Sequence, residues 1–173
     1  MLIWLYDAHY LTDHLKRKGL ILAYIGKVSY NAGGTIVHYA LLMLFSNFSP
    51  TPLRNETLDS LGKLYQELRL VFIDKFSLLG SRLLFCIDYW MRNIKHVQTK
   101  YFGNVDIIFC GDLYQARPIQ DPIIFQQHIL NKQPIAYDFW KKNVKFYEFH
   151  ITMRQIDVKL ISILNRMQKN TQT

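Results

Sequence analysis

Two short apolar runs in this sequence each lead into an acidic residue. Residues 105–109 (VDIIF) are mostly apolar, and Asp112 follows shortly after; residues 70–73 (LVFI) end directly in Asp74. Short apolar runs of this kind are typical of buried parallel strands, and ligands bind at the carboxyl ends of such strands in open α/β sheets. The pattern therefore predicts a phosphate and metal site between two neighbouring strand tips. The alternative is that both carboxylates only cap turns.

Helix and strand patterns alternate along the rest of the chain. Asp138–Trp140 is expected to lie in a helical turn, with Trp140 in the core. On the long helix at 79–97 one apolar stripe faces the core, and Arg92 and Lys95 are assigned to the solvated face. The alternation predicts an α/β fold in which a mostly parallel sheet is flanked by helices. The other predicted elements are helices at 8–18, 58–68, 123–131 and after Asp157, and strands at 20–24 and 145–151.

The composition restricts the function classes only in part. With 173 residues, half of them hydrophobic, the chain has room for one globular domain. The net charge of +8 suits a polyanionic partner, but a basic balance reports an average field and not a site. Cys86 and Cys110 lack zinc-like spacing and are expected to be reduced thiols. The longest apolar run is too short to span a membrane, so an intracellular protein is expected.

Residues 25–29 imitate a phosphate-binding loop without being one. A P-loop requires Gly, four residues, and then Gly-Lys-Ser/Thr, so that backbone amides wrap the phosphates. Here Ile21 stands where the first glycine belongs, and Val28 stands where the hydroxyl belongs. The segment is therefore not a P-loop.

Four segments, in order, carry a resemblance to a known family. They resemble motifs of the PIF-type (petite integration frequency) DNA helicases of superfamily 1B, which include the helicase of Helitron transposons. In chain order the segments are LAYIGKVSYNAGGTIVHYAL, VFIDKFSLLGSRLL, GDLYQARPI and EFHITMRQIDVKLISILNRM. The resemblance covers residues 20–167. It implies an N-terminally truncated, RecA-like P-loop NTPase fold, with residues 1–173 as a partial first RecA-like domain. In that family a P-loop precedes this region and a second RecA-like domain follows it.

The resemblance also implies roles for individual residues in binding ATP and Mg²⁺. Asp74 would hold Mg²⁺ through its water shell, and Ser77 would help to position the metal, the alternative being that Ser77 caps the next helix. Gln115, with Asp112 beside it, would sense the γ-phosphate. Arg154 would reach the γ-phosphate with its planar guanidinium, the alternative being a structural salt bridge.

At one catalytic position the sequence departs from the family. The family has a glutamate after the Walker B aspartate, where it accepts a proton from the attacking water or orients it. Here that position is Lys75. An ammonium group has no acceptor, so hydrolysis is expected to be lost or severely reduced.

A loop for single-stranded DNA is the last implied site. The family resemblance places DNA contacts at Asn31, Thr35 and His38. The alternative for His38 is a helix-start residue that makes a local hydrogen bond.

Three interpretations of the chain follow. The first is part of an ATP-dependent 5′-to-3′ DNA helicase, which by resemblance would serve DNA repair, recombination and telomere maintenance in the nucleus or, alternatively, the mitochondrion. The second is a non-catalytic module that binds single-stranded nucleic acid. The third is an inert transposon-derived relic. Whether this chain is itself an enzyme stays open on the sequence alone.

Overall fold

The computed structural model describes most of the chain between residue 18 and residue 168. The predicted helix at 8–18 lies almost entirely outside the described residues. So does most of the helix predicted at 123–131, and its described part, residues 123–125, is not helical. The described ranges are 18–26, 30, 33–42, 53–125, 135–149 and 157–168.

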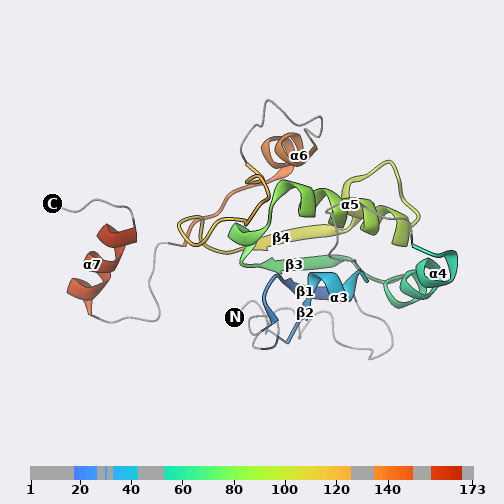
Figure 1. Ribbon diagram of the computed structural model, residues 1–173, viewed down its shortest axis with the longest axis horizontal. Helices are drawn as coiled ribbons and strands as arrows, with labels where there is room; N and C mark the ends of the chain where they lie inside the picture. The colour runs from blue at the N-terminus through green and yellow to red at the C-terminus, as the bar shows by residue number, and fades with distance from the viewer. Residues whose placement is uncertain are drawn as a thin grey trace.

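The centre of the fold is a parallel four-stranded sheet (Figure 1). Its strand order is β2-β1-β3-β4, and every neighbouring pair is parallel. This confirms the α/β class and the predicted strands at 20–24, 70–74 and 105–109 to within a residue or two at each end. The strands are β1 (Gly19–Ala23), β2 (Thr35–Ile36), β3 (Leu70–Asp74) and β4 (Asp106–Cys110).

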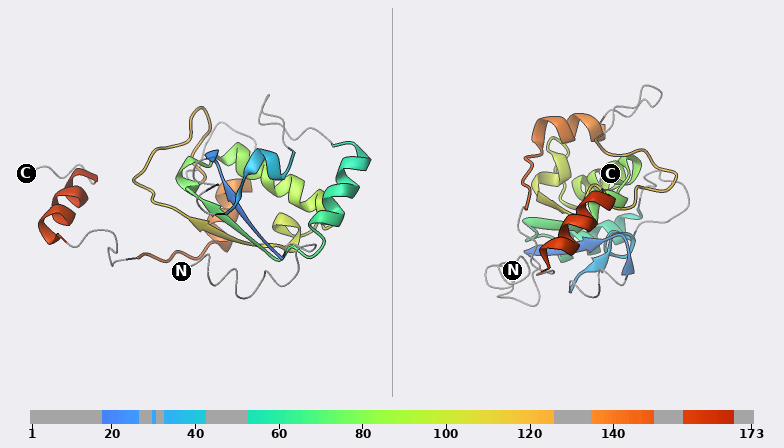
Figure 2. Two further views of the ribbon diagram at one scale, coloured as in Figure 1. Left: turned by 90° about the horizontal axis from the view of Figure 1, so that it is seen from below. Right: turned by 90° about the vertical axis from the view of Figure 1, so that its left-hand side faces the viewer.

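α3 and α4 lie between β2 and β3, and α5 lies between β3 and β4, as expected for parallel strands. Figure 2 shows α3, α4 and α5 on the same side of the sheet, and α7 stands apart from the sheet in Figure 1. Two short 3₁₀ turns, η1 (Phe76–Leu78) and η2 (Tyr101–Asn104), flank α5. The helices are α3 (Val37–Ala40), α4 (Asn55–Leu64), α5 (Ser81–Ile94), α6 (Ile135–Asn143) and α7 (Val158–Gln168).

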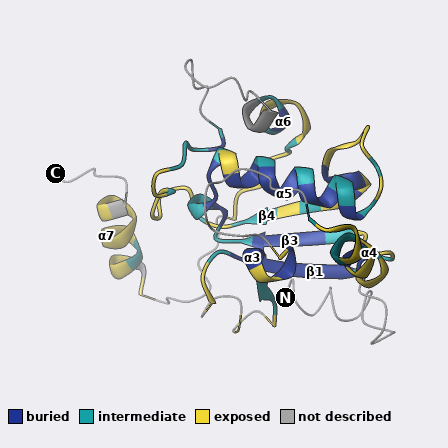
Figure 3. Cartoon of the chain, turned by 45° about the vertical axis from the view of Figure 1, so that its right-hand side comes forward, coloured by how far each residue is buried: buried dark blue, intermediate teal, exposed yellow. Residues whose placement is uncertain are grey.

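One hydrophobic core lies between α5 and the sheet. Val71 and Ile73 of β3 join it, and Ile87 and Met91 of α5 are fully buried against them. Figure 3 shows the same distribution, with β1, β3 and much of α5 buried and α7 largely exposed. The prediction that Trp140 belongs to the core is supported, because its ring stacks on Phe76 with centroids 5.6 Å apart and packs against the core cluster.

The outer edge of the sheet differs from its centre. β4 pairs with β3 on one side and with no strand of the described chain on the other, and Ile108 is 37% exposed. The strand predicted at 145–151 is wrong over its described part: residues 145–149 are not in a sheet. Their alternation is strand-like, but a strand needs a neighbour to pair with, and Phe146, Tyr147 and Phe149 are instead exposed.

Polar groups of α5 turned out to be structural where a solvated face was predicted. The buried Asp88 carboxylate accepts hydrogen bonds from the Phe102 amide (2.6 Å) and from Arg92 Nε (2.8 Å). Arg92 also donates to the carbonyl of Gln98 (2.6 Å) and lies over the Tyr101 ring. These bonds fix the turn at η2, where Phe102 adopts a left-handed backbone conformation (φ 50°).

Lys95 has a similar structural role at the end of α5. Its Nζ donates to the carbonyls of Tyr65, Gln66 and Leu68, at 3.2, 2.7 and 3.2 Å. These carbonyls follow the carboxyl end of α4, where a cation is favourable. Burial, followed by the nearby charge of Arg69, lowers the pKa of Lys95.

We predict that Asp88→Ala destabilises the protein far more than a surface ion-pair mutation does. The substitution leaves the Phe102 amide buried without its acceptor, which costs about 1–3 kcal/mol, and it also removes the ion pair with Arg92. Asp138→Ala is the matched control, because it removes another i,i+4 pair, Asp138–Lys142, whose side chains are 47% and 69% exposed. Exposed pairs contribute about 0–1 kcal/mol.

Urea unfolding of the two variants measures this difference. Equal losses in the free energy of unfolding would contradict the structural role of Asp88.

Candidate functional site

The carboxyl ends of β3 and β4 lie side by side. Asp74, the last residue of β3, is paired with Cys110, the last residue of β4, and Asp112 follows two positions later. Burial, and secondly the charge of Asp74, raise the pKa of the Cys110 thiol. The sheet therefore brings together the two acidic segments that the sequence predicted at neighbouring strand tips.

A glycine makes the close approach of the two tips feasible. A Cβ on Gly111 would lie 2.9 Å from Phe76 Cδ1, 3.1 Å from the Phe76 nitrogen and 3.3 Å from Lys75 Cα. Such contacts are tighter than packed side chains normally allow, so residue 111 must lack a side chain for β4 to continue past the end of β3.

Both carboxylates make local turn hydrogen bonds. Asp74 Oδ1 accepts from the Lys75 amide (2.7 Å), and Asp112 Oδ1 accepts from the Tyr114 amide (2.9 Å). These are the bonds that the turn-capping alternative expected. They leave room for the phosphate and metal interpretation as well, because a carboxylate has two oxygens and several lone pairs.

Lys75 occupies an unusual backbone position directly after Asp74. It has φ 55° and ψ 47°, in the left-handed region, which costs a residue with a side chain about 1–2 kcal/mol. Its carbonyl accepts a hydrogen bond from the Leu78 amide (3.0 Å), which closes the η1 turn. The Lys75 side chain is partly exposed, and the Lys75 amide is the group that contacts the Asp74 carboxylate.

Ser77 lies within η1, and its environment decides one of its two alternatives. The N-cap of α5 is Gly80, so Ser77 is not a helix cap. Its Oγ is buried and has no hydrogen-bond partner among the described residues. A buried hydroxyl without a partner is uncommon, and it leaves Ser77 available for a ligand near the tip of β3.

Gln115 lies on the exposed loop that follows β4. Its amide donates to the Asp112 carbonyl (3.1 Å), so residues 112–115 form a tight turn, and its side chain is exposed. Arg154, the remaining predicted phosphate ligand, lies outside the described residues.

Two of the three predicted DNA contacts can be located. Thr35 begins β2 and pairs with Leu22, and His38 lies in α3. The His38 ring is buried, meets Tyr24 edge-on with centroids 6.0 Å apart, and has a pKa lowered by burial. Asn31 lies outside the part of the chain that the structure describes, and the DNA role of all three stays a prediction.

The structure adds one residue to the site that sequence reasoning missed. Asp121, at the far end of the Gln115 loop, accepts hydrogen bonds from the amides of Arg82 (3.0 Å) and Leu83 (3.1 Å) at the start of α5. Burial raises the pKa of its carboxyl, and those two amide hydrogen bonds oppose the shift. No local pattern predicts this contact, since the partners are 39 and 38 residues apart in sequence.

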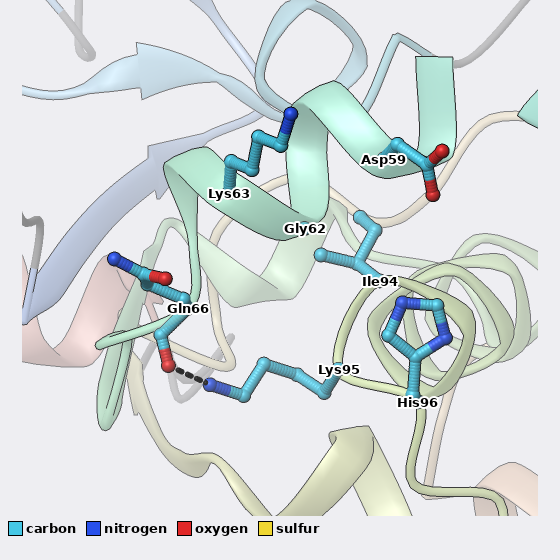
Figure 4. Close-up of a pocket in the computed structure, with 7 residues that line it drawn as sticks. All are labelled: Asp59, Gly62, Lys63, Gln66, Ile94, Lys95 and His96. Atoms are coloured by element: carbon cyan, nitrogen blue, oxygen red, sulfur yellow. Dashed lines mark hydrogen bonds between the residues drawn. The ribbon is translucent and has the colours of Figure 1, made fainter. Parts of the chain in front are cut away.

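A hollow of 380 Å³ lies at the carboxyl-terminal end of α5 (Figure 4). It lies between α4 and the end of α5, and the Lys95 Nζ that borders it is bonded to the Gln66 carbonyl. Since α5 has 14 residues and rises about 1.5 Å per residue, the hollow is about 20 Å from the capped helix start. It is therefore separate from the strand tips. The residues that line it are Asp59, Gly62, Lys63, Gln66, Ile94, Lys95 and His96.

Neither a cluster of protein metal ligands nor a membrane span is found in the described chain. Its His, Cys, Asp and Glu residues form no group of three or more that could hold a metal ion. Among the same residues no helix is both long and apolar enough to cross a membrane. Cys86 and Cys110 are free thiols.

Comparison with known proteins decides the family. The family described as PIF1-like helicase matches residues 14–171 of the chain. The chain belongs to the PIF1-like helicase family. Curated relatives include the ATP-dependent DNA helicase PIF1 of Saccharomyces cerevisiae (strain YJM789), 30% identical over 111 residues, and that of Candida albicans, 24% identical over 113 residues. Each alignment covers 60% of this chain and 12% of the relative.

Solved structures of PIF1-like helicases share the fold. The chain is similar to Bacteroides Pif1 crystallised with ADP-AlF3 and single-stranded DNA, with a TM-score of 0.71 and 22% identity over 99% of this chain. It is also similar to Pif1 from Candida albicans, with a TM-score of 0.69 and 18% identity over 96% of this chain. It spans 40% and 36% of those two chains. The four-stranded parallel sheet flanked by helices is thus that of a RecA-like helicase domain.

We predict opposite effects of alanine at two glycines. Gly111→Ala forces a Cβ against Phe76 and Lys75, and overpacking of this kind costs about 1–3 kcal/mol. Gly62→Ala, within α4, meets only ordinary contacts at 3.5 and 3.8 Å and is expected to stabilise the protein by about 0.4–1 kcal/mol.

Thermal unfolding of the two single variants tests the pair. A neutral Gly111→Ala would show that the strand tips are not in tight contact.

Proposed function

We propose that this chain forms part of the first motor domain of an ATP-dependent DNA helicase that moves 5′ to 3′ on single-stranded DNA. The observation that carries the proposal is that the carboxyl ends of β3 and β4 lie side by side. Asp74 and the start of the Gln115 loop are therefore at the same end of the sheet. Family membership supports it. Two crystal structures of Bacteroides Pif1 contain single-stranded DNA, one of them together with ADP-AlF3.

The donor groups at this edge fit ATP and Mg²⁺. The Asp74 carboxylate offers the hard oxygen that Mg²⁺ prefers, and the Ser77 hydroxyl is buried beside the tip without a partner in the described chain. In the proposal Asp74 holds the hydrated ion, Ser77 orients it, and Gln115 and Arg154 contact the γ-phosphate. Bound Mg²⁺ would neutralise charge on the phosphate oxygens.

Lys75 sets the limit of this activity. Hydrolysis needs an acceptor that takes a proton from the attacking water or orients it, and the ammonium group of Lys75 provides none. It can attract a phosphate, but attraction to the ground state does not accelerate the reaction. Unwinding further requires closure against a second RecA-like domain. We therefore propose that this chain can bind ATP but hydrolyses it slowly or not at all.

A second candidate function is binding of single-stranded nucleic acid without catalysis. The observation that favours it is the replacement of the catalytic carboxylate by a cation in a chain whose net charge is +8. In this candidate Asn31, Thr35 and His38 form the DNA-contacting loop. An inert relic, the third interpretation, predicts neither activity nor specific binding.

We predict that Lys75→Glu restores turnover in a longer protein. The comparison uses this domain given an upstream P-loop and a second RecA-like domain, with either lysine or glutamate at position 75. A positioned general base typically contributes about 10²–10⁴-fold, so DNA-stimulated ATP hydrolysis should rise by at least 10²-fold with glutamate.

Asp74→Ala in the glutamate version is the control and should abolish the gain. Equal turnover with lysine and glutamate would refute the assignment of position 75. DNA-stimulated hydrolysis by the chain as it stands would refute the proposal that it is impaired.

We also predict salt-dependent binding of single-stranded DNA by the unmodified chain. Neutralised phosphates release counterions, so a plot of log K against log salt for oligo(dT) should fall by roughly 0.7 per phosphate contacted. Polyglutamate serves as the control polyanion, and filter binding over a salt series gives both slopes. Equal affinity for the two polymers would show that the net charge alone causes the binding, and it would contradict the second candidate function.

A further inference from the structure

The loop that carries Gln115 is attached at both ends to one short segment. At its start, Gly111 is packed against Lys75 and Phe76; at its end, Asp121 and Pro122 bond the first residues of α5. Both anchors therefore lie on residues 75–83, the stretch that directly follows Asp74.

The second anchor is a helix cap supplied from outside the helix. Gly80, the N-cap of α5, has no side chain with which to cap it. Asp121 instead binds the Arg82 and Leu83 amides with its two carboxylate oxygens, at 3.0 and 3.1 Å. The Pro122 carbonyl accepts from the Ser81 amide (2.7 Å) and from Ser81 Oγ (3.2 Å). Amides at the start of a helix have no partner within it, so these bonds satisfy donors that need an acceptor.

Steric fit supports the same contact. A Cβ on Gly80 would overlap the Asp121 carboxyl group, so glycine is required for the carboxylate to reach the helix start. An isolated antiparallel bridge between Gly80 and Ile123 continues the contact, and Ile124 is fully buried behind it. The anchor thus combines backbone pairing, a cap and a buried side chain.

Between its anchors the loop is largely exposed. The Tyr114 and Gln115 amides donate hydrogen bonds to Asp112 within the loop. Tyr114 and Ile119 are 63% and 81% exposed. The two anchors therefore fix the ends of the loop between which Gln115 lies.

We propose that Asp121 is a positioning residue that holds the Gln115 loop beside the tip of β3 by capping α5. Its importance for phosphate sensing rests on the proposed function; the mechanical link does not. Because both anchors lie on residues 75–83, a displacement of that segment by a ligand at Asp74 is carried to both ends of the Gln115 loop at once.

Backbone amide order parameters of the full chain, measured by NMR, test the link. In Asp121→Ala the order parameters of residues 112–120 should fall below about 0.6, the range of flexible backbone, from higher values in the unmodified chain. Asp157→Ala is the matched control, because Asp157 also caps a helix through two amides, those of Lys159 and Leu160. It should loosen the start of α7 and leave residues 112–120 unchanged.

Two results would overturn the proposal. One is loosening confined to residues 81–83, which makes Asp121 a cap with no hold on the loop; the other is no change in either region. Asp121→Asn keeps one acceptor oxygen and should loosen the same residues less, so it replaces the alanine variant if that does not fold. Titration of the unmodified chain with MgATP, followed at the Lys75 and Gln115 amides, tests the proposed function separately, since the link can hold even if no nucleotide binds.

Discussion

Parallel pairing of β3 with β4, closed at its carboxyl end by the contact of Gly111 with Phe76, is the constraint on which the site depends. The pairing puts Asp74 opposite Cys110, and the contact keeps β4 close as it continues into Asp112. A one-residue change of register would reverse the faces of all side chains on β4. Asp74 and Cys110 would then no longer be paired at the carboxyl ends of β3 and β4.

Helix α5 is hydrogen-bonded to the chain on both sides of β4. At its start, Asp121 and Pro122 bond its first amides. At its end, Lys95 bonds carbonyls that follow α4, and between them Asp88 holds the turn before β4. The same helix therefore bonds both the turn before β4 and the end of the loop after it, so the segments on either side of β4 are attached to one element.

The pattern of apolar residues was sufficient to predict the strands β3 and β4. The run at 70–73 is apolar because β3 is buried in the middle of a parallel sheet, and the run at 105–109, on the more exposed edge strand β4, was also predicted to within a residue. Determinants that are distant in sequence could not be read in this way. Asp121 bonds amides 38 and 39 residues away, and the alternating residues 145–149 form no strand because pairing depends on a neighbour, not on alternation.

The candidate site was likewise predictable where short sequence motifs mark its residues, and not where contacts join distant segments. Asp74 and Asp112 were predicted from the strand-tip pattern and Ser77 and Gln115 from the family resemblance, and the sheet brings the segments after β3 and β4 to its carboxyl end. The structural work of Asp88 was missed, although an acidic residue on an apolar helix stripe, four positions before an arginine, is a pattern that could have revealed it. Arg154 and Asn31 cannot be compared with the structure, since both lie outside its described ranges.

Position 75 separates the stability of the scaffold from its chemistry. What the fold requires there is a left-handed backbone whose amide binds Asp74 and whose carbonyl binds the Leu78 amide. The side chain takes no part in these bonds and lies outside the core cluster. Either a lysine or a glutamate can therefore occupy the turn with the same scaffold around it. The substitution acts on what the site can do with a phosphate and a water molecule, because it replaces a proton acceptor with a cation at the tip of β3.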